Sequence, residues 1–302
     1  MYKTKSEFSG FARKKPLTNR RSRQQTRPKT KAELETVRHE EGIRLQKVLA
    51  EHGLGSRRQM ETLIADGQVS VNNEVATLGT KVISSDRIRV RGKLLHRQMQ
   101  HALPRVLIYH KQEGEIVSRS DPEGRKSVFD QIPRLKSLKW ISIGRLDYNT
   151  EGLLIFTTSG ELANRFMHPR YQIEREYAVR LLGELTEAHI QKLKEGFELE
   201  DGFVKVKTLQ ILAGEGVNRW YRITLTEGRN RVVRRVFETL GFTVSRLMRV
   251  RFGNVNLPPR LKRGQWQELT DDEVRQIVQF LPTEAVPMEG EIDSEEQFDL
   301  NY

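Results

Sequence analysis

The chain has 302 residues, no cysteine and a formal net charge of +12. The absence of cysteine excludes a disulfide-stapled secreted domain, a thiolate zinc site, an iron–sulfur cluster and a cysteine nucleophile. The basic surplus favours a polyanionic partner, because Lys and Arg side chains that neutralise phosphates release condensed counterions. No stretch approaches the ~20 apolar residues of a membrane-spanning helix, and residues 1–15 lack the apolar centre of a signal peptide. We therefore expect a cytoplasmic protein with no membrane partner.

Charge divides the sequence into four segments. Residues 1–42 carry a net charge of +7 with little apolar periodicity, which predicts a disordered basic arm. Residues 43–103, with +5, and residues 104–281, with +7, contain the apolar patterns of two folded domains. Residues 282–302 carry −7 and no Lys or Arg, which predicts a disordered acidic tail.

Residues 43–103 are predicted to form a compact module of two short helices followed by strands. Residues 45–49 place apolar side chains on one helical face, and Gly53 ends the first helix. A capping box of Ser56 and Gln59 begins the second helix.

Strand patterns follow in this module at residues 69–71 and 88–93, with Asn72-Asn73 as a hairpin turn. The exposed faces of the two helices are predicted to carry four basic residues, which are Arg44, Lys47, Arg57 and Arg58. A phosphate near the start of the second helix also meets the positive backbone potential of a helix N-terminus. An ordinary solvated helix face explains these charges equally well.

Residues 104–281 read as a larger α+β domain that is rich in sheet. The strand-like runs are 106–109, 140–143, 153–157, 177–182 and 220–225. The helical runs are 161–167, 187–194 and 230–240. The domain lacks the strict strand–helix alternation of a doubly wound fold.

The segment from Trp140 to Phe156 holds a polar loop between two apolar strands. Asp147 lies in this loop between Gly144 and Gly152, so a carboxylate is presented from a rigid support with close backbone approach possible. Such a loop is suited to carrying a catalytic side chain. The alternative is that Asp147 only caps a turn and pairs with Arg145.

The helix predicted at 230–240 is strongly amphipathic. Its buried stripe is formed by Val233, Val236, Phe237 and Leu240, and its other face carries Arg231, Arg234, Arg235 and Glu238. The charged face is either a functional surface or an exposed face with an Arg234–Glu238 pair worth only ~0.3–0.5 kcal/mol.

Four motifs give the chain a resemblance to ribosomal pseudouridine synthases. They are Gly144-Arg-Leu-Asp147, Thr150-Glu-Gly-Leu-Leu154, Arg175-Glu-Tyr177 and Glu227-Gly-Arg-Asn-Arg231. The module at 43–95 resembles the S4 RNA-binding domain, which points to the branch that contains synthase A of the small ribosomal subunit and synthases B, E and F of the large one. Residues 156–169 are most similar to the synthase B group of that branch. The resemblance implies an S4-like module at 43–103 and a mixed, mainly antiparallel-sheet catalytic domain at 104–281.

The resemblance also implies roles for individual residues. Asp147 would be the nucleophile that attacks C1′ or C6 of a flipped-out uridine, and Tyr177 would lie against its base. Arg234 would pair with the Asp147 carboxylate, with Arg231 as the next candidate for that role. Arg145 would fill the space left by the flipped base. Three arginines are expected to contact RNA in this domain, which are Arg145, Arg229 and Arg231.

The implied partner is ribosomal RNA, either 23S rRNA or a large-subunit assembly intermediate, and we expect a monomer without cofactor. The seven histidines show no zinc-binding spacing, and no phosphate-binding loop or complete dinucleotide fingerprint is present. We therefore expect neither a metal nor a nucleotide cofactor.

Three other interpretations remain open from the sequence. Glu151 could act with Asp147 as the second carboxylate of glycosidase-type chemistry. The chain could be a non-catalytic rRNA-binding or ribosome-assembly protein. It could also be a synthase of the same family that acts on small-subunit rRNA.

Overall fold

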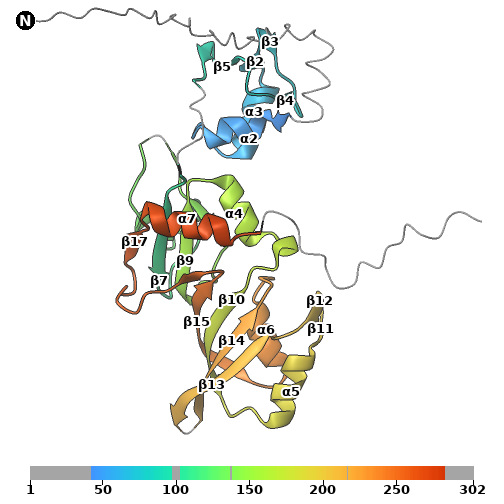
Figure 1. Cartoon of the computed structure of the whole chain (residues 1–302), viewed down its shortest axis with the longest axis vertical. Helices are drawn as coiled ribbons and strands as arrows, with labels where there is room; N and C mark the ends of the chain where they lie inside the picture. Colours follow the sequence, from blue (N-terminus) through green and yellow to red (C-terminus); the bar gives the residue numbers. More distant parts are fainter. Residues whose placement is uncertain (1–41, 97–102, 137, 216, 283–302) are drawn as a thin grey trace, which may run out of the picture.

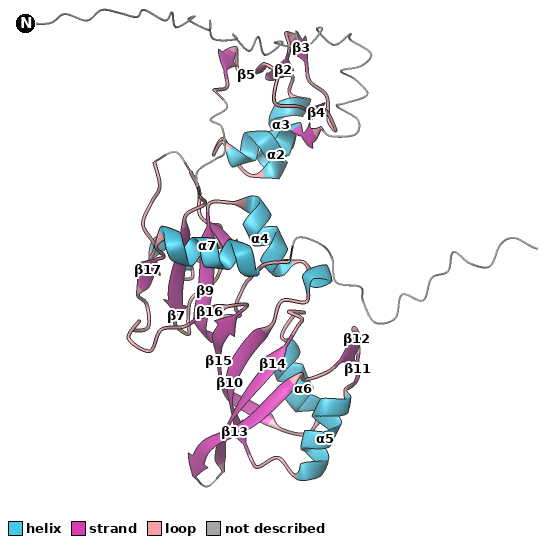
Figure 2. Ribbon diagram, viewed as in Figure 1, coloured by secondary structure: helices cyan, strands magenta, loops and turns pink. Residues whose placement is uncertain are grey.

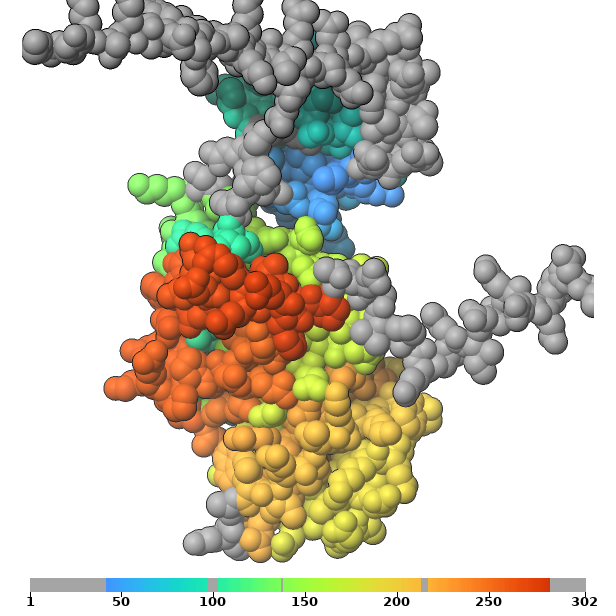
Figure 3. Space-filling view, in the orientation of Figure 1, coloured from blue at the N-terminus to red at the C-terminus, as the bar shows by residue number. Residues whose placement is uncertain are grey.

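The computed structural model describes residues 42–96, 103–136, 138–215 and 217–282. Nearly all of the predicted basic arm and acidic tail, residues 1–41 and 283–302, lies outside the described residues. The described chain forms a small N-terminal unit and a larger unit, which Figures 1 and 3 show one above the other along the long axis of the molecule.

The small unit packs two helices against short strands. Leu45 and Leu49 of the first helix meet Ile64 of the second helix in a core that also contains Val69 and Ile88. Its strands form a four-stranded sheet of order β3-β2-β5-β6 and a separate pair, β1-β4. The elements are β1 (Ile43–Arg44), α2 (Leu45–Glu51), α3 (Arg57–Ala65), β2 (Val69–Val71), β3 (Glu74–Val75), β4 (Lys81–Val82), β5 (Ile88–Val90) and β6 (Lys93–Leu94).

The cap and the hairpin turn predicted in this unit are confirmed. The Ser56 hydroxyl accepts a hydrogen bond from the Gln59 backbone N–H, and the Gln59 side chain accepts one from the Ser56 N–H. Asn72 and Asn73 both have positive φ and join β2 to β3. Asn tolerates this conformation better than other residues with a side chain, which is why the pair marks a hairpin.

Two details of the predicted module are wrong. Arg44 lies in strand β1 before α2 and not on the helix face, because it pairs with Lys81 of β4. The strand predicted at 88–93 ends at Val90, and the chain turns at Arg91-Gly92, where both residues have positive φ.

The larger unit is built on a nine-stranded sheet among the described residues. Seven strands follow the order β13-β14-β10-β15-β9-β7-β17, while β8 pairs with β9 and β16 pairs with β15. Every pair is antiparallel except β9 with β15. The predicted α+β class with a mainly antiparallel sheet is confirmed. The strands are β7 (Val106–Lys111), β8 (Ile141–Ile143), β9 (Glu151–Thr157), β10 (Arg175–Leu182), β13 (Thr208–Glu215), β14 (Asn218–Leu225), β15 (Thr243–Phe252), β16 (Val255–Asn256) and β17 (Trp266–Glu268).

Helices cover the two halves of this sheet separately. Helices α4 and α7 pack on the half that contains β7 and β9, and α5 and α6 pack on the half that contains β10 and β14. Figure 2 shows α7 in front of its half of the sheet and α6 behind the other half. The helices are α4 (Gly160–Met167), α5 (Glu187–Glu195), α6 (Val232–Thr239) and α7 (Asp271–Phe280), and a separate hairpin consists of β11 (Phe197–Leu199) and β12 (Gly202–Val204).

The two halves meet where β9 and β15 run parallel, with Gly152 opposite Arg249. Gly152 has a φ of +105°, and a Cβ atom at this position would lie 2.2 Å from the backbone oxygen of Arg249. A side chain cannot fit there without moving a strand, and the positive φ also favours glycine. The glycine therefore permits the close strand approach that fixes the loop preceding β9.

Replacing Gly152 by alanine is expected to lower the free energy of unfolding by about 2–3 kcal/mol, because the two strands must separate to admit the methyl group. Gly241→Ala is the control, since Gly241 also has a positive φ, +84°, but an added Cβ would meet no atom within 4 Å. Urea unfolding followed by circular dichroism measures both variants. Equal losses of stability would contradict a role for the close strand approach.

Candidate active site

A cavity of about 580 Å³ lies between the loop that joins β8 to β9 and the loop that precedes α6. We call the first of these, residues 144–150, the Asp147 loop. The volume falls in the range of pockets that enclose small organic ligands. The cavity is lined by one carboxylate, one phenol and several guanidinium groups, which belong to Asp147, Tyr177, Arg145, Arg175, Arg229, Arg231 and Arg249.

The structure thus brings together five of the residues singled out in the sequence. Asp147 and Arg145 come from one loop, Tyr177 from β10, and Arg229 and Arg231 from the other loop. These residues are separated by up to 86 positions in the chain and meet only through the sheet. Their convergence favours a single site for an anionic ligand.

The backbone of the Asp147 loop is held by the buried side chain of Lys111. Its ammonium group donates hydrogen bonds to the carbonyl oxygens of Asp147, at 3.0 Å, and Thr150, at 2.9 Å, and to its neighbour Gln112 at 3.0 Å. These three bonds use all the protons of an ammonium group. Burial lowers the pKa of Lys111 to about 8, although carboxylates including Glu115 and Asp147 act in the opposite direction.

The two remaining carbonyl groups of this turn are also bonded. The Asn149 oxygen accepts a hydrogen bond of 2.8 Å from the guanidinium of Arg234, and the Tyr148 oxygen accepts one of 3.0 Å from the Gly114 backbone N–H. Every carbonyl from Asp147 to Thr150 therefore has a donor. The loop is fixed through its backbone and not through its carboxylate.

The Asp147 carboxylate itself has neither a hydrogen-bond nor an ion-pair partner in the described part of the chain. It is half-buried and lines the cavity. A carboxylate on a fixed backbone with unoccupied oxygen atoms is suited to attack an electrophilic carbon or to accept a proton. The alternative role of Asp147 as a turn cap paired with Arg145 is not what the structure shows.

Arg234 lies beneath the loop and does not line the cavity. Its side chain is buried, and its second donor bonds the Val244 carbonyl at 2.9 Å. The ion pair that the resemblance implied between Arg234 and Asp147 is not formed among the described residues. Burial and the neighbouring Arg231 lower the pKa of Arg234, while Asp147 raises it, so the two opposite charges still attract each other. Of the two interpretations of this helix face, the one that leaves it exposed does not hold for Arg234, whose side chain is buried.

The floor of the cavity contains two buried arginines on either side of Tyr177. Arg249 lies opposite Tyr177 in the β10–β15 register, and Arg175 lies two residues before it on the same strand. Both guanidinium groups stack on the Phe252 ring, at 4.6 Å for Arg175 and 4.8 Å for Arg249. Burial lowers the pKa of Arg175 to about 10 and also lowers that of Arg249. The floor is therefore positive without a carboxylate of its own.

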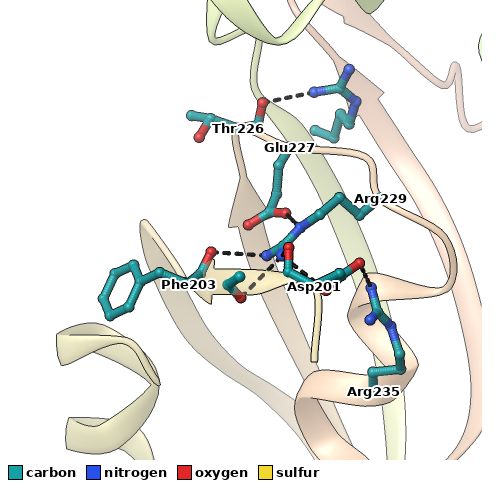
Figure 4. A network of polar contacts seen from close by, with 8 residues as sticks. Asp201, Phe203, Thr226, Glu227, Arg229 and Arg235 are labelled. Carbon is teal, nitrogen blue, oxygen red and sulfur yellow. Dashed lines mark hydrogen bonds and ion pairs between the residues drawn. The ribbon is translucent and has the colours of Figure 1, made fainter. Parts of the chain in front are cut away.

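Arg229 is predicted to contact RNA, but its donors are used within the protein. Figure 4 shows its guanidinium between Glu227, Asp201 and Phe203. It pairs with Glu227, bonds the Asp201 carboxylate at 2.9 Å and bonds the Phe203 carbonyl at 2.8 Å. Arg235 also pairs with Asp201, at 2.7 Å. These contacts attach the loop before α6 to the β11–β12 hairpin.

Arg145 and Arg231, in contrast, are exposed and form no ion pair within the described residues. Arg231 immediately precedes α6 with a φ of +48°, an unusual backbone conformation for a residue with a side chain. Strained positions of this kind are concentrated at functional sites. These two charges are free to meet phosphate groups at the cavity rim.

The four basic residues predicted for the small unit lie away from this cavity. Arg44, Arg57 and Arg58 are exposed, and Lys47 is 3.9 Å from Glu51. Arg57 reaches toward the larger unit, where its guanidinium lies 3.9 Å from the position of a Cβ atom built on Gly160 at the start of α4. The small unit therefore offers a separate basic surface.

Glu151 is not a second carboxylate of the cavity. It is buried, and its two oxygens are bound by Arg246 and Arg263, each at 2.6 Å. Burial raises its pKa, but the two arginines outweigh that effect and lower it overall. Two-carboxylate chemistry with Asp147 is therefore not supported.

Three residues of the site, Lys111, Arg175 and Arg249, were assigned no role from the sequence, although Arg175 begins one of the four motifs. A role for Arg175 in the site could have been predicted, because residues two apart on a strand share a face and Tyr177 was already placed in the site. Lys111 is the last residue of the otherwise mostly apolar strand β7, and this position is only a weak sign of a role in the site. Arg249 lies in a strand that has no clear alternation of apolar residues.

Comparisons with known proteins identify the family of each unit. Residues 105–239 match the family described as RNA pseudouridylate synthase, and residues 43–88 match the S4 domain. Among the described residues, no helix has the length and apolar character needed to span a bilayer.

The chain is similar over most of its length to relatives named ribosomal large subunit pseudouridine synthase B. It is 50% identical over 250 residues to ribosomal large subunit pseudouridine synthase B of Haemophilus influenzae, and the aligned region covers 81% of this chain and 70% of the relative. It is 52% identical over 231 residues to the protein of the same name from Yersinia pestis, and this aligned region covers 76% of this chain and 73% of the relative.

A solved structure described as a pseudouridylate synthase shares the fold. It superposes with a TM-score of 0.55 at 28% identity and covers 78% of this chain and 99% of that chain. Together with the sequence relatives, this similarity shows that the chain belongs to the RNA pseudouridylate synthase family and carries an S4 domain before its synthase domain.

Proposed function

We propose that this pseudouridine synthase isomerises a specific uridine of large-subunit ribosomal RNA, either in 23S rRNA or in an assembly intermediate. The substrate is supported by the names of the relatives from Haemophilus influenzae and Yersinia pestis, both large-subunit enzymes at about half identity. The observation that carries the catalytic assignment is the Asp147 carboxylate, which lines the cavity and has no partner among the residues that the structure describes, while its loop is held through four carbonyl groups.

Asp147 is assigned as the nucleophile. The isomerisation breaks the bond between N1 of uracil and C1′ of the ribose and forms a bond between C5 and C1′. The proton at C5 is lost and N1 gains a proton, so no atom enters or leaves overall. A carboxylate is able to form the covalent intermediate at C1′ or C6 and then to accept the C5 proton.

The other cavity residues are assigned to binding the flipped uridine. Tyr177 presents a phenol against the base, where the ring stacks and the hydroxyl takes part in proton transfer. Arg145 occupies the space that the uridine leaves, because a stacked base hides its reacting atoms until it is flipped. Arg231 meets phosphate at the rim, and the positive floor of Arg175 and Arg249 stabilises negative charge that develops on the base.

Arg234 and Lys111 are assigned as positioning residues rather than catalytic ones. Neither side chain lines the cavity, and both bond carbonyl groups of the Asp147 loop. Arg229 is assigned the same kind of role for the loop before α6, because Asp201 and Glu227 engage its guanidinium.

The S4 unit is assigned to docking on the ribosomal RNA. Its basic residues, the exposed Arg44, Arg57 and Arg58 and the half-buried Lys47, add phosphate contacts outside the cavity. We propose the residue division predicted from the sequence, with docking at 43–103 and catalysis at 104–281, and a cytoplasmic monomer that needs no cofactor.

Asp147→Asn is expected to abolish pseudouridine formation, because the amide keeps the size of the side chain but is not a nucleophile. Wild type and variant are compared on large-subunit and small-subunit rRNA fragments, with pseudouridine read by chemical mapping. Asp66→Asn, at an exposed position in the small unit, is the control and is expected to stay active. Conversion by Asp147→Asn would refute the nucleophile. A wild-type protein that binds RNA but converts neither rRNA fragment would support a non-catalytic binding protein. Conversion of only the small-subunit fragment would overturn the proposed substrate.

Arg234→Ala and Arg235→Ala remove the same charge from adjacent positions of α6. We expect Arg234→Ala to lower the single-turnover rate at saturating RNA by about 100-fold, because the Asp147 loop shifts when the Asn149 carbonyl loses its donor. Arg235→Ala removes only the pair with Asp201 and should retain most of the rate. Circular dichroism verifies that both variants are folded, and equal rates in the two would contradict the positioning role of Arg234.

A further inference from the structure

The segment between β7 and β8 forms a second hollow that the catalytic assignment does not use. Its volume is about 600 Å³, similar to that of the catalytic cavity, and the two share no lining residue. We call it the β7–β8 hollow and define it by the residues that carry the argument, which are Arg119, Phe129, Arg134, Lys139 and Trp140.

One wall of the hollow is a preformed stack of Arg119 on Phe129. The Arg119 guanidinium lies 4.1 Å from the centre of the Phe129 ring and donates a hydrogen bond of 2.6 Å to the Trp140 carbonyl. Phe129 is in turn held edge-on against Phe156, with ring centres 5.5 Å apart. Because a guanidinium is planar, covering one face leaves the other for a further stack, and nucleobases stack on arginine planes in RNA complexes.

The rim of the hollow supplies charge for a phosphate group. Arg134 and Lys139 are exposed and have no ion-pair partner in the described part of the chain. Asp121 also lines the hollow, but Arg125 neutralises it at 2.7 Å. The basic side chains that line the hollow therefore outnumber its two carboxylates, Asp121 and Asp130, of which Asp121 is already paired. The basic residues are Arg119, Arg125, Arg134 and Lys139.

Strand β8 connects the hollow to the catalytic cavity. Trp140 lines the hollow immediately before the strand, whereas Ser142 and Gly144 line the cavity. At ~3.3 Å per residue in a strand, the distance from Trp140 to Gly144 is about 13 Å. Among the described strands β8 pairs only with β9.

We propose that the β7–β8 hollow is a second RNA subsite, which takes an unpaired nucleotide of the same RNA whose uridine enters the catalytic cavity. The base stacks on the free face of Arg119, and the phosphate meets Arg134 and Lys139. The subsite rests on the proposed function in so far as the ligand is the substrate RNA. It adds affinity and selects substrates with an unpaired nucleotide at the matching distance, but it takes no part in the chemical step.

Arg119→Lys and Arg134→Gln test the two halves of the subsite in the full-length protein. Arg119→Lys keeps the charge and removes the planar stack, and Arg134→Gln removes the charge. Each is expected to weaken binding of the substrate RNA fragment by about tenfold, with the single-turnover rate at saturating RNA unchanged within about twofold. Lys194→Gln, an exposed lysine on α5, is the control and should leave the affinity unchanged.

Filter binding measures the affinity, and photo-crosslinking of RNA that carries 4-thiouridine at successive positions locates the contact. A crosslink to the peptide that contains Phe129 supports the subsite. Unchanged affinity in both variants would overturn it, as would a loss of saturating rate equal to the loss of affinity. A wild type that binds the RNA but forms no pseudouridine would refute the proposed function, while the affinity of the variants would still decide the subsite.

Discussion

The backbone of the Asp147 loop is held in place by two buried cations, and the rest of the site depends on this arrangement. Lys111 bonds the carbonyl groups of Asp147 and Thr150, and Arg234 bonds that of Asn149. A cation that bonds the backbone fixes the loop without occupying the carboxylate. An ion pair to the carboxylate would fix the loop equally well, but it would compete with substrate for the same oxygens. The Asp147 carboxylate is thus held on a rigid backbone while its oxygen atoms remain available to a ligand.

The same division between structural and available charges is found across the cavity. Arg229 is used internally by Asp201 and Glu227, and Glu151 is enclosed by Arg246 and Arg263. Arg145 and Arg231 on the rim form no ion pair among the described residues and are left for the ligand. The two floor arginines, Arg175 and Arg249, are buried and bond backbone carbonyl groups while still lining the cavity. Because fixed charges need no reorganisation when substrate arrives, they stabilise developing charge more effectively than mobile ones. The high content of arginine therefore serves two purposes, of which only one is contact with RNA.

The sequence allowed the hairpin, five strands of the larger unit and every described α-helix except α7 to be predicted, because apolar spacing, caps and turn residues are local signals. Helix α7 and strands β13 and β17 were missed. It also placed Asp147, Tyr177, Arg145 and Arg231 in one site, through motifs that resemble a known family. It did not yield the long-range bonds: Lys111 meets the loop 36 positions further along the chain, and periodicity does not identify such a partner. Strand β15 was missed because three arginines interrupt its apolar pattern, one of which, Arg249, is buried. The sequence also did not reveal that Arg229, an arginine of one of the motifs, has the protein partners Asp201 and Glu227.

The most direct test of this account is the single-turnover rate of Lys111→Met at saturating RNA. Methionine has a similar length and is apolar, so it fills the buried site but leaves the carbonyl groups of the loop without a donor. The account predicts a rate about 100-fold below that of the wild type, with RNA affinity little changed, because Lys111 does not line the cavity. Lys126→Met, which removes an exposed lysine paired with Glu115, should keep the wild-type rate. A folded Lys111→Met protein with the wild-type rate would contradict the claim that buried cations position the nucleophile.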